Sequence, residues 1–161
     1  MKTYLHLSIL VLLLSTSCQE PVLNWTIQTV KGSVNTVKLG KTLIHEHILV
    51  DFIGADSTDY HRWDRAAVIE KVLPYPQEIK ALGYETIIDC TPAYLGRDPQ
   101  LLKMLSEQSG LYILTNTGFY GARNNQFVPD YAYRESAGQL ADHRMKQEEE
   151  ILEGIRIYLP S

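Results

Sequence analysis

The stretch that decides the fold is Thr42-Leu43-Ile44-His45-Glu46-His47-Ile48-Leu49-Val50, a compact and mostly apolar segment. Its β-branched and leucine residues, followed by a polar loop over residues 51–64, predict a short buried strand. Residues two apart on a strand point to the same face, so His45 and His47 are expected to lie side by side. The stretch therefore predicts a strand that carries two neighbouring imidazoles close to its carboxyl end.

Two further apolar segments repeat this pattern along the chain. Residues 84–90 and 111–117 are predicted as the second and third buried strands, and a helical segment follows each strand. This order predicts an α/β fold with a parallel sheet. Right-handed crossovers would bring the carboxyl ends of the strands, with His45, His47 and Asp89, to one edge. Ligands bind at that edge in α/β folds.

Proline and glycine mark the bounds of the elements around the first strand. A short β-hairpin is predicted over residues 27–39, around a central glycine. After the first strand, a helix is predicted to begin near Trp63 and to break at Pro74 and Pro76. It then resumes and ends at Gly83, a typical C-cap residue.

The later helices have equally clear boundary residues. Asp98 is interpreted as the N-cap of the second helix rather than as an acid catalyst, because Pro99 follows it in the first turn. Gly110 ends this helix. Its predicted buried face consists of Leu101, Leu102 and Leu105. A charged third helix follows a loop over residues 118–138, and its predicted core contacts are Met145, Ile151 and Leu152.

The pair His45-x-His47 is the main candidate for chemistry. Two imidazoles on one strand face can reach one metal ion at about 2.0–2.1 Å from each nitrogen. The alternative interpretation is two ordinary histidines on either side of an exposed glutamate. A metal site commonly takes three or four ligands, so the pair alone leaves both interpretations open.

The other polar candidates have simpler interpretations. Asp89, at a strand end, either orients a ligand or loop or has a structural role. His61 and His143 lie in polar surroundings and are predicted to be solvated. Cys90 is interpreted as a small buried hydrophobe, and the run of acids at residues 148–150 as the solvent face of the last helix.

Five segments, in order along the chain, carry a family resemblance. The segment Gly40-Lys41-Thr42-Leu43-Ile44-His45-Glu46-His47 resembles the first-strand motif of the phosphotriesterase family within the amidohydrolase superfamily. The further segments that resemble this family are Ile88-Asp89-Cys90-Thr91-Pro92, Gly96-Arg97-Asp98-Pro99, Asn116-Thr117-Gly118-Phe119-Tyr120 and Glu149-Glu150-Ile151-Leu152-Glu153-Gly154-Ile155. The resemblance runs from about residue 27 to residue 155, which suggests an N-terminal portion of such a protein.

The resemblance implies a fold, a cofactor and an activity. The family fold is a (β/α)8 TIM barrel that holds two divalent metals, usually zinc, at the carboxyl ends of its strands. His45 and His47 are then ligands of the more buried metal. A hydroxide held between the metals attacks a small phosphotriester, lactone or other ester. Tyr120 matches the tyrosine that lies beside the metal centre in lactonase-like members.

The same resemblance implies that part of the barrel is missing. The family site also takes a carboxylated lysine, two later histidines and an aspartate, and this chain departs from the family pattern after Ile155. Residues 19–161 are therefore predicted to be a truncated domain with about the first three βα units, inactive alone as a metal-dependent hydrolase. The alternative is a non-catalytic, membrane-anchored remnant, or a partner that docks its open sheet edge onto another chain.

The N-terminus predicts export from the cytosol. Residues 1–18 combine Lys2, an apolar run over residues 5–14 that is too short to span a bilayer, and small residues before Cys18. This pattern resembles a bacterial lipobox, so residues 1–18 are predicted to be a signal peptide with Cys18 lipidated. The alternative is a plain secretion signal. The expected location is periplasmic, or on a membrane through the lipid anchor, in a bacterium.

Composition excludes several classes of protein. The 161 residues are 45% hydrophobic and 21% charged, which argues against disordered and fibrous proteins. A formal charge of −4 gives no reason to expect nucleic acid as a partner. With only two cysteines, the chain has no disulfide framework.

Overall fold

The computed structural model describes residues 25–156, apart from the side chains of residue 148 and of residues 150–156. The predicted signal peptide with Cys18 lies outside these residues, as do the predicted core contacts of Ile151 and Leu152. Within residues 25–156, no helix has the length and apolar character needed to cross a membrane.

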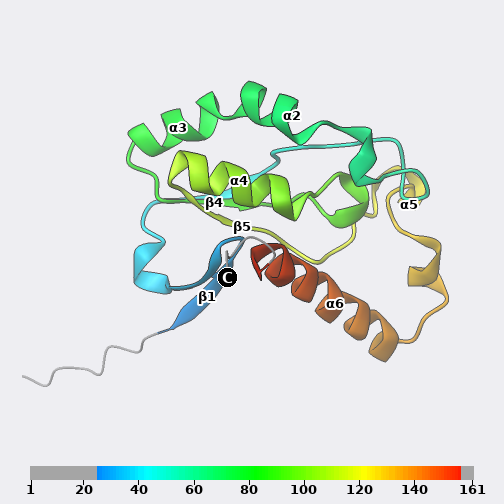
Figure 1. The fold of residues 1–161 in the computed structure, drawn as a ribbon. Coiled ribbons are helices and arrows are strands. Elements are labelled where there is room, and N and C mark those ends of the chain that lie inside the picture. Colours follow the sequence, from blue (N-terminus) through cyan, green and yellow to red (C-terminus); the bar gives the residue numbers. More distant parts are fainter. Residues whose placement is uncertain (1–24, 157–161) are drawn as a thin grey trace, which may run out of the picture.

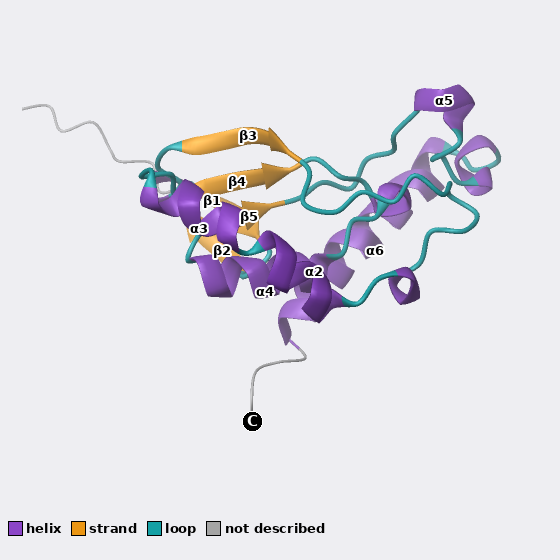
Figure 2. Ribbon diagram, turned by 90° about the horizontal axis from the view of Figure 1, so that it is seen from above, coloured by secondary structure: helices purple, strands orange, loops and turns teal. Residues whose placement is uncertain are grey.

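Three parallel strands form the central sheet. In spatial order they are β3 (Thr42–Glu46), β4 (Thr86–Asp89) and β5 (Tyr112–Leu114). Figure 2 shows their arrows pointing the same way, toward the long loops and helix α5 (Ala122–Asn125). The predicted α/β fold with a parallel sheet is therefore confirmed.

Helices and short 3-10 turns connect these strands. The longer helices are α2 (Arg65–Val72), α3 (Pro74–Ala81), α4 (Pro99–Ser109) and α6 (Ala137–Arg156). The 3-10 turns are η1 (Thr36–Lys38), η2 (Tyr60–Arg62), η3 (Ala93–Leu95) and η4 (Asp130–Tyr133). Helices α2, α3 and α4 lie next to one another, and α6 contacts α4 (Figure 1).

The predicted hairpin precedes the sheet. Strands β1 (Thr26–Thr29) and β2 (Gly32–Asn35) pair in antiparallel fashion, and Gly32 takes a φ of +117° that side chains rarely allow. The N–H of Val30 donates to the carbonyl of Ile113 at 2.9 Å, which fastens the hairpin to β5. The hairpin prediction is therefore confirmed.

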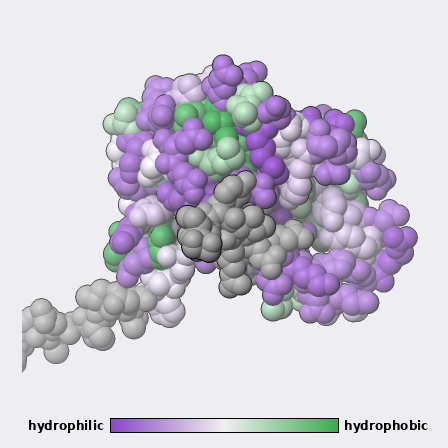
Figure 3. All heavy atoms as spheres, in the orientation of Figure 1, coloured by the Kyte–Doolittle hydropathy of each residue, from purple (hydrophilic) through white to green (hydrophobic). Residues whose placement is uncertain are grey.

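The apolar core lies where the helices meet the sheet and the hairpin. The three leucines predicted for the buried face of α4 are fully or almost fully buried, as expected. They cluster with Val30, Ile69 and Ile113. Full burial of such a side chain contributes roughly 1.5–3 kcal/mol, so this cluster is a main source of stability. On the face drawn in Figure 3, hydrophilic residues predominate and apolar residues form smaller patches.

Several sequence-based bounds were wrong. The helix does break at Pro74 as predicted, since α2 ends at Val72 and α3 begins at Pro74, where a first helical position suits the fixed φ of proline. Pro76, however, lies inside α3 and does not break it. Strand β3 ends at Glu46 instead of Val50, and its register with β4 shifts after Leu43. Met145 is 62% exposed and contributes no core contact, because α6 turns this position toward solvent.

Cys90 also differs from its prediction as a buried hydrophobe. It directly follows β4 and is only half-buried. Its Sγ lies 3.9 Å from the carbonyl oxygens of both Ile44 and Ile88. The strand ends one residue earlier than predicted, which leaves the thiol partly open at the sheet edge.

Asp98 is confirmed as a helix cap. Its Oδ1 accepts the N–H groups of Gln100 and Leu101, both at 3.1 Å. Its Oδ2 accepts from the indole N–H of Trp63 at 2.9 Å and from Nε of Arg65 at 2.6 Å. The carboxylate is therefore fully engaged in joining α4 to the start of α2.

Replacing Asp98 with Ala should destabilise the fold. The variant leaves two helix amides and two side-chain donors without an acceptor. A lost cap costs about 1 kcal/mol, and the ion pair with Arg65, whose side chain is 32% exposed, contributes less than the roughly 3 kcal/mol of a fully buried pair. We therefore expect the free energy of unfolding to fall by about 2–3 kcal/mol. Urea unfolding followed by circular dichroism measures this difference.

Asp130→Ala is the matched control. The Asp130 side chain is 79% exposed and pairs with Arg134 at 3.6 Å. Its removal should change the free energy of unfolding by less than about 0.5 kcal/mol. Similar losses in the two variants would contradict the structural role of Asp98.

Candidate functional site

His45 and His47 lie together at the carboxyl end of β3. Their ring centroids are 5.2 Å apart with an angle of 70° between the ring planes. Both residues are exposed. His45 lies within β3, and His47 lies one residue beyond the end of the strand. The two imidazoles therefore lie next to each other, as predicted.

A chain of hydrogen bonds orients the ring of His47. The Thr91 hydroxyl donates to Oδ1 of Asp89 at 3.0 Å and lies 3.1 Å from Nδ1 of His47. Because the hydroxyl proton goes to Asp89, its oxygen can accept a proton from Nδ1–H. This arrangement assigns the proton of His47 to Nδ1 and leaves the lone pair on Nε2, the nitrogen free to bind a metal.

Asp89 is the buried residue at the end of this series of hydrogen bonds. Its side chain is only 1% exposed, and Oδ1 also accepts the N–H of Ile48 at 3.0 Å. Burial raises the pKa of the Asp89 carboxyl, and the hydrogen bonds from Ile48 and Thr91 lower it by less. Of the two roles left open by the sequence, the geometry gives Asp89 the orienting one.

Thr91 is a functional residue that the sequence pattern does not single out. It is fully buried, and its contact with His47 spans 44 positions of the chain. A threonine two residues after a strand-end aspartate was the available signal, but its partner His47, just beyond β3, depended on the sheet register.

A cavity of about 290 Å³ opens above the two histidines. Tyr120, predicted for the substrate pocket, lines the same cavity and is 43% exposed. The lining residues are His45, His47, Val50, Phe52, Cys90, Pro92, Leu95, Asn116, Phe119 and Tyr120. No carboxylate is among them. The fold therefore brings all three predicted site residues of the described part together in one largely apolar hollow.

The side chains at this cavity supply two of the three or four ligands that a metal site commonly uses. Two imidazole nitrogens suit a divalent cation, and His47 has its tautomer fixed. Over residues 25–156, no group of three or more histidine, cysteine, aspartate or glutamate side chains is placed to hold a metal. Further ligands would have to come from outside these residues.

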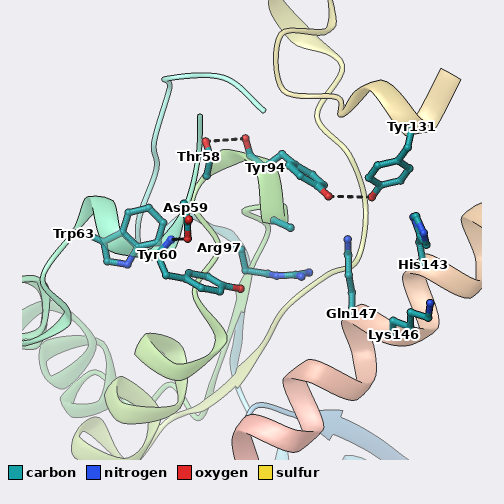
Figure 4. Close-up of a pocket in the computed structure, with 11 residues that line it drawn as sticks. Thr58, Asp59, Tyr60, Trp63, Tyr94, Arg97, Tyr131, His143, Lys146 and Gln147 are labelled. Atoms are coloured by element: carbon teal, nitrogen blue, oxygen red, sulfur yellow. Dashed lines mark hydrogen bonds between the residues drawn. The ribbon is translucent and has the colours of Figure 1, made fainter. Parts of the chain in front are cut away.

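A second cavity of about 310 Å³ lies between the loop before α2 and helix α6 (Figure 4). Tyr94 and Tyr131 meet there through a hydroxyl–hydroxyl hydrogen bond of 3.2 Å, and the guanidinium of Arg97 points into the space. Burial raises the pKa of Tyr131 above its ordinary value. No strand end reaches this cavity with paired imidazoles, so we assign the catalytic candidate to the first one.

His143 was predicted to be solvated, and this was wrong. Its side chain is 34% exposed, and Nδ1 lies 3.3 Å from Oε2 of Glu135. The imidazole packs edge-on against the ring of Tyr131, with 4.4 Å between the ring centroids. His61, in contrast, is 75% exposed and lies 3.0 Å from Asp59, as expected for a surface residue. Hydrogen bonding to His61 lowers the pKa of Asp59.

The fold and site define an α/β protein with a histidine-bearing ligand cavity at the carboxyl edge of its sheet. A sequence model of the phosphotriesterase family matches residues 25–157. The chain belongs to the phosphotriesterase family.

Individual relatives agree with this assignment. The phosphotriesterase homology protein of Escherichia coli (strain K12) is 25% identical over 118 residues, which are 73% of this chain and 38% of that protein. The N-acetyltaurine hydrolase of Rattus norvegicus is 27% identical over an alignment of 125 positions, and the match covers 61% of this chain and 36% of that enzyme. The chain thus spans well under half the length of these curated relatives.

Solved structures give the same result. An organophosphorus hydrolase from Deinococcus radiodurans superposes with a TM-score of 0.59 at 34% sequence identity. The match covers 81% of this chain and 37% of that one. The α/β fold therefore resembles that of hydrolases in the phosphotriesterase family.

Replacing Asp89 with Asn should change how stability depends on pH. The amide keeps an acceptor oxygen for Ile48 and Thr91 but cannot ionise. Because the folded-state pKa of Asp89 is raised above 3.8, its carboxyl contributes most stability below that value and less as the pH rises. The stability of the wild type relative to Asp89→Asn should therefore fall as the pH rises above about 4.

Urea unfolding of both proteins at a series of pH values measures this difference. Asp59→Asn provides the opposite control, because the pKa of Asp59 is lowered in the fold. A wild-type advantage over Asp89→Asn that grows with pH would show that Asp89 is not a destabilised buried carboxylate.

Proposed function

We propose that this chain carries part of the active site of a metal-dependent hydrolase, with His45 and His47 as ligands of a divalent metal, zinc by family resemblance. The observation that supports this most directly is the pair of neighbouring imidazoles over the cavity at the carboxyl edge of the sheet. Catalytic residues of TIM-barrel enzymes lie at this edge. A partial (β/α)8 barrel is accordingly the proposed architecture.

The residues around the metal position have separable tasks. A divalent metal would supply Lewis acidity at the reacting carbonyl or phosphoryl group. Thr91, held by Asp89, keeps Nε2 of His47 available and its ring fixed. Tyr120 and Phe52 line the cavity and give it an aromatic surface for an apolar part of the substrate.

The proposed substrate is a small ester, lactone or phosphotriester, and the relatives add amides. Organophosphorus hydrolase and N-acetyltaurine hydrolase are the names of proteins similar to this chain. These names share one reaction type, the hydrolysis of an acyl or phosphoryl bond. The described residues contain two ligands where a catalytic zinc site uses three, so we propose that the chain has no turnover by itself.

Zinc binding tests this proposal on the chain as it exists. We expect weak zinc binding by the purified protein that is lost in His45→Ala/His47→Ala. Thr91→Val should weaken binding by about tenfold, because ligands that lose their orienting hydrogen bond typically lose 10–100-fold in affinity. Competition with a chromophoric chelator measures the dissociation constants.

His61→Ala/His143→Ala is the matched control, since both histidines lie away from the strand-end cavity. It should bind zinc like the wild type. Equal binding by the two double variants would remove His45 and His47 from the metal site. Zinc-dependent hydrolysis of a lactone or phosphotriester by the 161-residue chain, lost in His45→Ala/His47→Ala, would disprove the proposed lack of turnover.

A second candidate function is association through the edge of the sheet. Within the described residues, β3 pairs only with β4, so its other edge has no strand partner. Ile44, in the middle of β3, is 74% exposed. An edge strand with an exposed apolar side chain favours pairing with a second chain. Export, with Cys18 as the lipid-bearing residue, remains part of either proposal.

Self-association measured by sedimentation velocity tests this second candidate. We expect the wild type to form dimers or larger species at micromolar concentration, and Ile44→Lys to shift the population to monomer, because a charge blocks edge pairing. Val37→Lys is the matched control: Val37 is 73% exposed but lies in η1, outside the sheet. Monomeric wild-type protein, or equal effects of the two lysines, would reject edge pairing.

A further inference from the structure

The loop beyond β5 has an unusual backbone near the strand-end cavity. Three consecutive residues, Arg123, Asn124 and Asn125, have φ values of +51°, +56° and +63°. Left-handed conformations are costly for residues other than glycine and occur one at a time in most proteins. Such strain is retained where the surrounding structure fixes it, often at ligand sites.

Contacts with the loop after β3 hold this strained turn in place. The N–H of Ala55 donates to the carbonyl of Gln126 at 2.9 Å, and Nε2 of Gln126 donates to the carbonyl of Ile53 at 3.3 Å. Phe127 is fully buried, with its ring centroid 5.8 Å from that of Phe52 and 5.7 Å from that of Tyr120. The turn is thereby tied to both aromatic walls of the cavity.

This anchoring places a cation at the rim of the cavity. The guanidinium carbon of Arg123 lies 5.3 Å from the ring centroid of Phe52, which lines the cavity. Arg123 is exposed and forms no ion pair with the carboxylates of the described residues. No carboxylate is among the described residues that line the cavity. An aromatic surface beneath a guanidinium also fixes its orientation.

We propose that Arg123 is a specificity residue that binds an anionic group of the substrate. The substrate class is then a small acyl compound with a carboxylate or sulfonate near the scissile bond, its acyl end facing His45 and His47. This inference rests on the proposed function, because it assigns the reacting bond to the histidine cavity. Guanidinium recognises either oxyanion through paired N–H donors.

Binding of matched amides to the metal-free chain tests this inference. The probes are N-acetyltaurine, N-acetyl-β-alanine and the neutral N-propylacetamide, which share one acetamide and differ in the terminal group. We expect both anions to bind about three- to tenfold tighter than the neutral amide at low ionic strength, as for a partly exposed ion pair. Nuclear magnetic resonance titration measures the affinities.

Variants of Arg123 test the origin of the preference. Arg123→Gln should abolish it, and Arg123→Lys should keep part of it, because lysine retains the charge without the planar fork. Arg134→Gln is the matched control: Arg134 has a 70% exposed side chain and pairs with Asp130 away from the cavity. It should keep the full preference for anions. Raising the salt concentration should reduce the preference in the wild type.

Equal affinity for anionic and neutral probes would overturn the inference, and so would a preference that survives Arg123→Gln. Absence of measurable anion binding up to the solubility limit would overturn it as well. Zinc titration of the same samples separates this inference from the proposed function. Zinc binding that persists while anion preference is absent removes only the role of Arg123. Anion preference without zinc binding at His45 and His47 removes the metal site instead.

Discussion

The buried carboxylate of Asp89 is the contact on which the arrangement of the site depends. It accepts one hydrogen bond from the N–H of Ile48, just beyond β3, and another from the hydroxyl of Thr91, just beyond β4. Next to it, the N–H of Cys90 donates to the carbonyl of Glu46 at 2.8 Å. These bonds tie together the two chain segments that leave neighbouring strands, so the first loops at the carboxyl edge have one defined geometry.

Burying this carboxylate is costly, and its hydrogen bonds only partly offset the cost, which explains the raised pKa. The buried carboxylate holds the Thr91 hydroxyl, which in turn orients the ring of His47. An imidazole that rotated freely or exchanged its tautomer would be a poorer metal ligand. The fold thus gives up some stability at Asp89 to hold the imidazole of His47 in place, in contrast with Asp98, whose carboxylate caps α4 and pairs with Arg65 at the start of α2.

Residues near the carboxyl ends of the described strands line one cavity. Active sites of barrel enzymes likewise draw residues from the ends of several strands, and a barrel is the proposed architecture of this chain. Here the described residues supply two imidazoles, an aromatic wall and the rim cation of Arg123. This chain matches under two fifths of the length of its family relatives. That fraction agrees with the proposed partial barrel.

Local sequence determined the order of the elements, the caps at Asp98 and Gly110, and the closeness of His45 and His47. Each of these depends on residues a few positions apart, whose backbone geometry and side-chain direction follow from local sterics and hydrogen bonding. Only the tertiary structure decided that Thr91 orients His47, that Arg123 lies over Phe52 and that Met145 faces solvent. Those outcomes depend on strand register and loop packing between segments distant in the chain, which no local pattern specifies.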